Sequence, residues 1–200
     1  MNDRYVEGQD LFTLVTYTPE PLRRWLVDLR RLLPVEANSQ PHITILPPRP
    51  LTMPVEEARQ KLTSVLARWT AFEIELTGVE VFPGTNVLYL DVRAGSEFLS
   101  RLHAELNQGS FAYQEPFPFH PHVTVGGPVP KQDLAFISRK AGEAWKSSLR
   151  NFRFKIQEIA FVSIAAHGIR GDWRRLWVHG LAGVEAYEQL ARAAITNQTF

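Results

Sequence analysis

The chain lacks cysteine altogether, and it has neither a strong net charge nor a long apolar run. The absence of cysteine excludes disulfide bonds, thiolate nucleophiles, iron–sulfur clusters and cysteine zinc sites, and it fits a reducing compartment. Lys and Arg number 22 and Asp and Glu number 21, so the formal net charge of +1 gives no overall attraction to duplex DNA. No apolar run approaches the ~18 residues of a membrane span, and the first ten residues carry no apolar leader. We therefore expect a cytoplasmic protein with no membrane or duplex-DNA partner.

Hydrophobic residues make up 44% of the 200 residues, which is enough to build the core of one compact domain over residues 1–200. We expect that domain to be a monomer. Apolar periodicity predicts alternating strands and helices. Strands are expected at residues 11–17, 42–46, 72–81, 87–93, 122–125, 152–161 and 173–179. Helical stripes of apolar side chains run through residues 22–33, 55–69, 99–106, 134–145 and 184–195.

Two details of the pattern concern strand ends and strand irregularities. Pro47-Pro48 is expected to end the second strand, because proline cannot donate a backbone hydrogen bond to a neighbouring strand. Around Gly78 the apolar positions change from even to odd numbers, which indicates a β-bulge. A similar slip follows Ile156 in the strand expected at residues 152–161.

The first half of the chain is repeated in the second half at an offset of 80 positions. Seven residues have an identical partner at this offset, namely Pro41, His42, Thr44, Pro48, Pro50, Arg59 and Phe72. Two copies of one unit predict two similar lobes that face each other about a pseudo-two-fold axis. We expect repeat one at about residues 11–82, repeat two at about 86–164, and a C-terminal strand and helix within 173–195. The predicted fold is α+β and bilobal, with two antiparallel-rich sheets flanking a central cleft and helices outside.

The sequence Pro-His-x-Thr lies at the same place in both repeats, at His42 with Thr44 and at His122 with Thr124. Residues i and i+2 of a strand point the same way, so each histidine shares a face with its threonine. If the lobes face each other, two imidazoles and two hydroxyls converge on one cleft. Imidazole suits both the base and the acid of phosphodiester cleavage, and hydroxyl groups can donate to phosphate oxygens.

The two motifs resemble those of the two-histidine (2H) phosphoesterases, the superfamily of the 2′-5′ RNA ligase-like proteins and cyclic nucleotide phosphodiesterases. The resemblance covers about residues 11–180, and residues 41–51 and 117–125 carry it. It implies metal-independent cleavage of 2′,3′-cyclic phosphates or 2′-5′ linkages, or the reverse ligation, by His42 and His122 with Thr44 and Thr124 on the phosphate. The implied partners are RNA ends, cyclic nucleotides or a related small phosphodiester, with no cofactor.

Further residues near the motifs are candidates for substrate binding, each with a plainer alternative. Four arginines could each reach a phosphate oxygen, although a solvated surface arginine is the simpler interpretation for each, namely Arg49, Arg170, Arg174 and Arg175. Four aromatic side chains could stack on a base, or they could pack between the lobes, namely Tyr113, Phe117, Phe119 and Trp173. His120 is expected at the rim of the site.

Two other classes of function stay open at this point. One is a protein that binds RNA or a nucleotide without catalysis. The other is a metalloprotein in which His120, His122 and His42 hold zinc. Elsewhere, His103 is expected in or near the core, and the pair Arg30-Arg31 is expected on the solvated face of the first helix.

Overall fold

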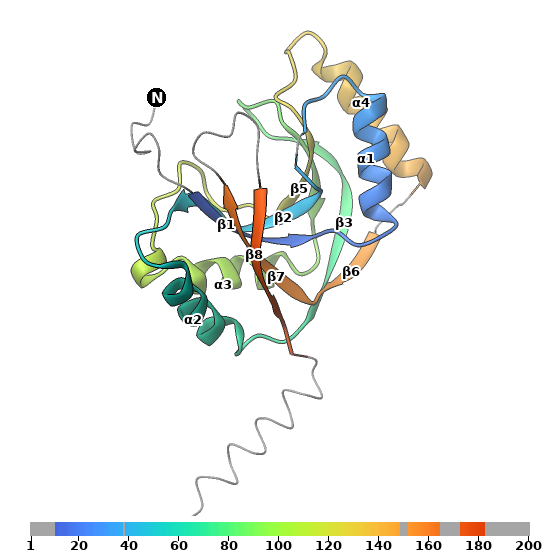
Figure 1. Cartoon of the computed structure of the whole chain (residues 1–200). Helices are drawn as coiled ribbons and strands as arrows, with labels where there is room; N and C mark the ends of the chain where they lie inside the picture. The colour runs from blue at the N-terminus through green and yellow to red at the C-terminus, as the bar shows by residue number, and fades with distance from the viewer. Residues whose placement is uncertain (1–10, 38, 149–151, 165–172, 183–200) are drawn as a thin grey trace, which may run out of the picture.

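The computed structural model of the protein describes residues 11–37, 39–148, 152–164 and 173–182. Within these ranges eight strands form one curled antiparallel sheet, and four α-helices pack on it, so the predicted α+β class is confirmed (Figure 1). The elements are β1 (Leu11–Tyr17), α1 (Leu22–Leu32), β2 (His42–Pro50), α2 (Val55–Leu66), β3 (Phe72–Val81), β4 (Leu88–Val92), α3 (Ser96–Leu106), a 3-10 turn (Gly109–Phe111), β5 (His122–Gly126), α4 (Leu134–Ser148), β6 (Phe152–Ile156), β7 (Glu158–Ile164) and β8 (Trp173–Gly180).

The strands follow the order β6-β3-β4-β5-β2-β1-β7-β8 across the sheet. Two separate sheets were expected, and this expectation is wrong, because β2 and β5 pair at Ile43 and Val123 and so join the two halves. The seam between β2 and β5 lies in the middle of the strand order, with four strands on each side. The two strands that carry the Pro-His-x-Thr motifs are therefore direct neighbours.

Each half of the sheet takes a strand from the other half of the chain. Beside β1 and β2 lies β7, and beside β4 and β5 lies β3. β6 and β7 are separated in the chain by Gln157 alone. In the sheet, however, β6 is the strand at one edge, and β7 lies beside β8, the strand at the other edge. One residue spans less than about 4 Å, so the sheet has to curl until its two ends approach each other. A parallel bridge between Thr70 and Ala182 joins the ends at a second point.

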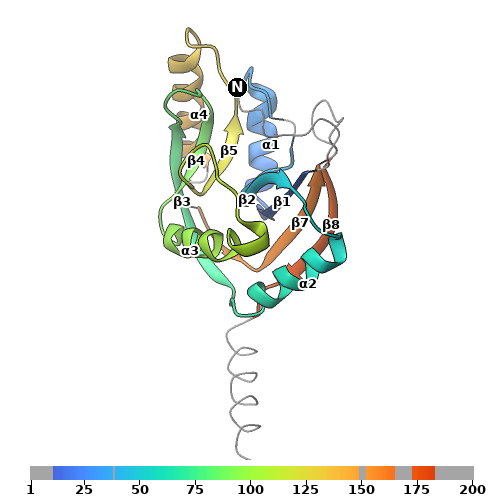
Figure 2. The same ribbon diagram turned by 90° about the vertical axis from the view of Figure 1, so that its left-hand side faces the viewer.

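The helices form two pairs that pack on the sheet (Figure 2). Trp25 of α1 meets Trp145 of α4 edge to face, with ring centroids 5.5 Å apart, and α2 contacts α3. The main core includes helix residues such as Leu26 together with Ile43 and Val123 from the seam. Because side chains alternate along a strand, the histidines and threonines beside Ile43 and Val123 project from the face opposite this core.

Three strand details differ from, or agree with, the sequence patterns. The expectation that the second strand ends at Pro47-Pro48 is wrong, because β2 continues to Pro50. Its pairing with β1 shifts register at these two prolines instead of stopping. The strand expected at residues 152–161 is two strands, β6 and β7, which lie in different halves of the sheet. The bulge near Gly78 is confirmed by a register shift between Leu76 and Val79.

Two expectations concern the ends of the chain and the membrane. The helix expected at residues 184–195 lies outside the described residues. Across the ranges that the structure describes, no helix is both long and apolar enough to cross a membrane.

Candidate active site

The two Pro-His-x-Thr motifs meet at the seam of the sheet. With Ile43 opposite Val123 in antiparallel register, Thr124 falls opposite His42 and Thr44 falls opposite His122. Cross-strand neighbours of this kind have Cβ atoms about 5 Å apart, and diagonal neighbours about 7–8 Å. The two imidazoles thus occupy one diagonal of a compact group of four side chains, and the two hydroxyls occupy the other.

Each imidazole is held by a backbone carbonyl two residues earlier in the chain. His42 Nδ1 lies 2.7 Å from the carbonyl oxygen of Gln40, and His122 Nδ1 lies 2.7 Å from that of His120. A carbonyl only accepts hydrogen bonds, so Nδ1 carries the proton in both rings and donates it. In each neutral ring Nε2 therefore carries a free lone pair, and Nε2 is the atom available for proton transfer.

Burial and nearby charges lower the pKa of both histidines. The pKa of His42 falls from 6.5 to about 4, mainly because burial disfavours the charged ring. The bond to the carbonyl of Gln40 opposes this shift, and the charges of Arg30 and His122 add to it. Burial also lowers the pKa of His122, but the carboxylate of Asp91 acts to raise it. The two imidazoles thus share one geometry and differ in their electrostatic surroundings.

The surroundings of His122 are acidic and aromatic. Asp91 lies opposite His122 on β4, and its Oδ1 is 3.0 Å from Nε2 of His120. The ring of Phe82 meets that of His122 edge to face at 4.8 Å and stacks on Tyr89 at 3.8 Å. His120, with a side chain 47% exposed, lies at the rim as the sequence predicts.

Around His42 the neighbours are aromatic and basic. Tyr17 lies opposite His42 on β1, and the ring of Trp173 on β8 lies 4.8 Å from the imidazole. The guanidinium of Arg175 lies 5.9 Å from the ring of Tyr17. Arg174, a predicted substrate contact, is exposed and falls between Trp173 and Arg175 on the strand, so it points to the opposite face. Of the predicted arginines near β8, the structure brings Arg175 to the Tyr17 side of the site and turns Arg174 away, while Arg170 lies outside the described residues.

A pocket of about 490 Å³ opens beside His122. Thr44 and His122 form part of its wall, and the loop over residues 115–120 supplies most of the remainder, including two of the predicted aromatic residues, Phe117 and Phe119. Phe119 stacks on His103 with centroids 4.0 Å apart. His103 is buried, as expected, and its Nδ1 lies 2.8 Å from the carbonyl oxygen of Ile45.

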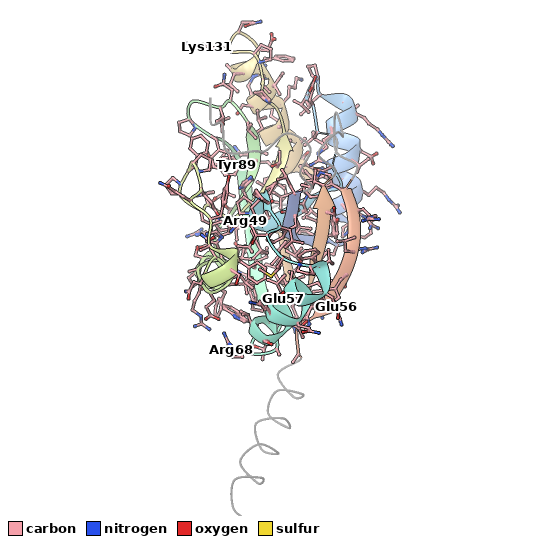
Figure 3. All side chains as sticks on the ribbon, turned by 60° about the vertical axis from the view of Figure 1, so that its left-hand side comes forward. Arg49, Glu56, Glu57, Arg68, Tyr89 and Lys131 are labelled. Atoms are coloured by element: carbon pink, nitrogen blue, oxygen red, sulfur yellow. The ribbon has the colours of Figure 1, made fainter. Side chains whose placement is uncertain are left out.

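Arg49 is the candidate that the structure places most differently. Its side chain is 1% exposed, in the middle of the molecule (Figure 3), rather than in solvent or on the pocket wall. Its guanidinium donates to Oε1 of Glu115 at 2.7 Å, to Oδ1 of Asn107 at 2.6 Å and to the carbonyls of Pro47 and Phe111. The expectation of a phosphate contact came from its position after the motif. The bonds show instead that Arg49 anchors the loop that forms the pocket wall.

Arg30 is a site residue that the sequence patterns did not identify. It was expected on the solvated face of the first helix, but its guanidinium donates to the carbonyls of Thr124, Val125 and Ser39. It thereby ties α1 to the second motif strand. Arg30 lies four positions after the buried Leu26, so helical spacing places it on the inward face, and this spacing could have identified it.

The zinc alternative receives no support from the geometry. Among the described residues, no group of three or more histidine, aspartate or glutamate side chains is arranged to hold a metal ion. Nδ1 of His42 and of His122 is in addition bonded to a carbonyl, and Nε2 of His120 faces Asp91.

Comparisons with curated proteins give partial matches. A protein of Geobacillus sp. (strain WCH70), provisionally named as a phosphoesterase, is 31% identical over 105 residues, 48% of this chain and 60% of that protein. A similarly named protein of Geobacillus kaustophilus is 32% identical over 99 residues, 48% of this chain and 57% of that protein. The chain thus matches somewhat over half the length of these relatives.

Solved structures and a family model extend the likeness to most of the chain. E. coli LigT in complex with phosphate has a TM-score of 0.58 at 18% identity, over 88% of this chain and 99% of LigT. The protein TT0787 of Thermus thermophilus has a TM-score of 0.57 at 20% identity, over 87% of this chain and 99% of that protein. These likenesses show a shared fold. The model of the 2′-5′ RNA ligase superfamily matches residues 18–168. With most of the chain covered by that model, the protein belongs to the 2′-5′ RNA ligase superfamily, the two-histidine phosphoesterases that its motifs resemble.

Proposed function

We propose that the protein is a phosphoesterase that cleaves 2′,3′-cyclic phosphates or 2′-5′ phosphodiester linkages of nucleotides or RNA ends. The observation that carries this proposal is the juxtaposition of the two motif strands, which brings two imidazoles with free Nε2 atoms next to two threonine hydroxyls. Membership of the superfamily and the complexes of E. coli LigT with phosphate and 3′-AMP support the same class of substrate.

Cleavage in this site requires two proton transfers on opposite sides of phosphorus. One imidazole takes the proton of the attacking oxygen at Nε2, and the other donates a proton from Nε2 to the leaving oxygen. The hydroxyls of Thr44 and Thr124 have no hydrogen-bond partner among the described residues, so both are available to donate to the non-bridging phosphate oxygens. Acid, base and phosphate donors are all protein groups in this scheme, which therefore proceeds without a metal ion.

The first prediction tests the paired histidines. His42→Ala and His122→Ala should each slow hydrolysis of a nucleoside 2′,3′-cyclic phosphate by roughly 10²- to 10⁴-fold, the usual contribution of one positioned acid or base. The double variant should be less than additively impaired, since acid and base act in one step. Thr44→Ala and Thr124→Ala should cost less, because each removes one neutral hydrogen bond. Initial rates with and without a chelator measure these effects.

The control is His179→Ala, which changes a histidine on β8 outside the seam. Its rate should equal that of the unaltered protein. Unchanged turnover in His122→Ala would rule out the paired roles and favour the alternative of a nucleotide-binding protein without catalysis. Loss of activity on chelation, restored by zinc, would favour the metal-based alternative. Incubating RNA ends with 5′-hydroxyl RNA tests the ligation direction.

A further inference from the structure

The pocket beside His122 is apolar, although it adjoins a site proposed to hold a phosphate. Its volume of about 490 Å³ is in the range of small-molecule sites. Phe82, Phe117 and Phe119 form its walls together with several prolines. The described lining residues include no lysine or arginine, and they do include the carboxylate of Glu115. A second anionic group of a ligand would therefore lose its hydration here without gaining a lysine or arginine partner.

Two of the three phenylalanine rings are held in place by stacking on one side. Phe82 stacks on Tyr89 at a centroid distance of 3.8 Å and an interplanar angle of 16°. Phe119 stacks on His103 at 4.0 Å and 4°. These walls are fixed by the protein itself, so a ligand does not have to order them.

Phe117, by contrast, is 67% exposed, and no other described residue makes a ring contact with it. It lies between Pro116 and Pro118, whose rings restrict the backbone on both sides. A large, exposed aromatic ring at the edge of an apolar cavity is typical of a binding surface, and planar bases stack favourably on such rings. The apolar lining and the exposed ring of Phe117 thus fit a flat, uncharged group.

Building on the proposed function, we propose that this pocket binds the nucleobase, or an equivalent neutral aromatic group, of the alcohol that leaves phosphorus. The leaving oxygen then departs beside His122 and water enters beside His42. The pocket wall contains His122 and Thr44 but not His42, which places the leaving alcohol on the His122 side of the phosphate.

The assignment gives each histidine one role in the hydrolysis of a cyclic phosphate. A bond forms between the water oxygen and phosphorus, the water proton passes to Nε2 of His42, and the bond from phosphorus to the ribose oxygen breaks. The ribose oxygen takes the proton from Nε2 of His122, and the product is a nucleoside monophosphate. The charges agree with these roles, because Asp91 lies beside His122, where a proton is to be held, and Arg30 acts on His42, which is to be neutral.

The first experiment measures binding to the full-length protein by calorimetry, with inorganic phosphate and adenosine 3′-monophosphate as probes. The nucleotide should bind more tightly than phosphate, and Phe117→Ala should remove roughly 5- to 100-fold of its affinity while leaving phosphate affinity unchanged. The matched control is Phe136→Ala, which removes another exposed phenylalanine, on α4 and outside the pocket, and should change neither affinity.

The second experiment tests the roles of the histidines with a 4-nitrophenyl phosphodiester, whose aryl leaving group departs without a proton. His122→Ala should lose far less activity on this ester than on a nucleoside 2′,3′-cyclic phosphate, whereas His42→Ala should lose as much on both. The reverse pattern would overturn the orientation. Failure of the unaltered protein to cleave the aryl ester, when it cleaves the cyclic substrate, would overturn the class of group assigned to the pocket.

The outcomes separate this inference from the proposed function. If phosphate binds and the cyclic substrate is cleaved, but Phe117→Ala binds the nucleotide normally, only the pocket assignment fails. If phosphate does not bind and no cyclic or 2′-5′ substrate is cleaved, the proposed function fails and the inference fails with it.

Discussion

A backbone carbonyl decides which nitrogen of each motif histidine carries the proton. The bonds from Nδ1 of His42 and His122 to the carbonyls of Gln40 and His120 have the same length and the same spacing in sequence. The intervening residue is a proline in both motifs, and its fixed φ angle restricts the position of the preceding carbonyl. The proline of Pro-His-x-Thr therefore limits where the carbonyl that accepts the bond from the ring can lie.

The lowered pKa values of the two histidines predict an acidic pH optimum for kcat/KM, which reports on the free enzyme. In the roles proposed above, His42 has to be neutral, and its pKa is about 4, while His122 has to be protonated, and burial lowers its pKa below 6.5. The plot of kcat/KM against pH should therefore be bell-shaped, with its maximum below pH 6.5. The optimum of kcat should lie higher, because a bound phosphate anion raises both pKa values. Rate profiles from pH 4 to 9 measure this, and an optimum of kcat/KM above pH 7 would contradict it.

Asp91→Asn should shift the alkaline limb of the kcat/KM profile to lower pH. The groups that face His122 are Asp91 and Tyr89 from β4, His120 from the preceding loop, and His42 across the seam. Among them the carboxylate raises the pKa of His122, so its removal lowers that pKa and the acid loses its proton earlier. Asp28→Asn, on the exposed side of α1, should leave the profile unchanged. An unmoved alkaline limb in Asp91→Asn would count against His122 as the acid.

Residue types and spacing predicted the four motif side chains, because a repeated pattern constrains both position and chemistry. The arginines were harder to place. Arg49 follows a motif and was expected in solvent or on phosphate, but Glu115 and Asn107, far along the chain, bury it. The partners of a long basic side chain depend on which loops fold against it, and local sequence does not contain that information.

At the scale of elements, the loop that forms the pocket wall depends on the buried pair of Arg49 and Glu115. Their side chains are 2% and 10% exposed, and N and O lie 2.7 Å apart. Arg49→Met would take the guanidinium away from the buried carboxylate and leave beside it, among the described residues, only the imidazole of His103, whose Nε2 lies 3.6 Å from Oε1, so it should lower the free energy of unfolding by about 3–5 kcal/mol. Urea denaturation of the variant measures this loss.

Two comparison variants make this prediction specific. The double variant Arg49→Met/Glu115→Gln removes the unpaired charge and should recover part of the lost stability. Arg59→Ala breaks the exposed pair with Glu56 on α2 and should leave the free energy of unfolding almost unchanged, because water and salt screen such a pair. Equal losses in Arg49→Met and Arg59→Ala would show that burial of the ion pair is unimportant.

Most elements could be predicted from apolar periodicity, but their connections could not. The two prolines in β2 are tolerated because the pairing with β1 shifts register beside them, and such a shift is a property of the pair of strands. The slip after Ile156 indicated an irregularity, yet one irregular strand and two strands in different halves of a sheet give the same apolar pattern. Only the partners of β6 and β7 distinguish them.

For the whole molecule, the exchange of strands between the two halves predicts that neither repeat folds alone. A fragment of residues 11–86 would contain β1 and β2 without β7, and β3 without β4 and β6, although all these strands pair in the sheet. Apolar side chains such as Phe12 and Ile74 would then be exposed to water. The fragment should lack a cooperative unfolding transition in circular dichroism, and a cooperative transition would show that the repeats are independent.

The pairing of Leu11 with Ile164 also has a consequence for protein synthesis. A ribosome releases β1 and β2 long before β7 is translated, so the growing chain carries the first motif on two strands that have each other as partners but lack their outer neighbours, β5 and β7. Chaperones are expected to bind the nascent chain during this interval, since the outer edges of this strand pair are still uncovered. Translation that stops before β7 would yield a product that holds both histidines in its sequence but leaves β1, the strand beside the first motif, without its second partner.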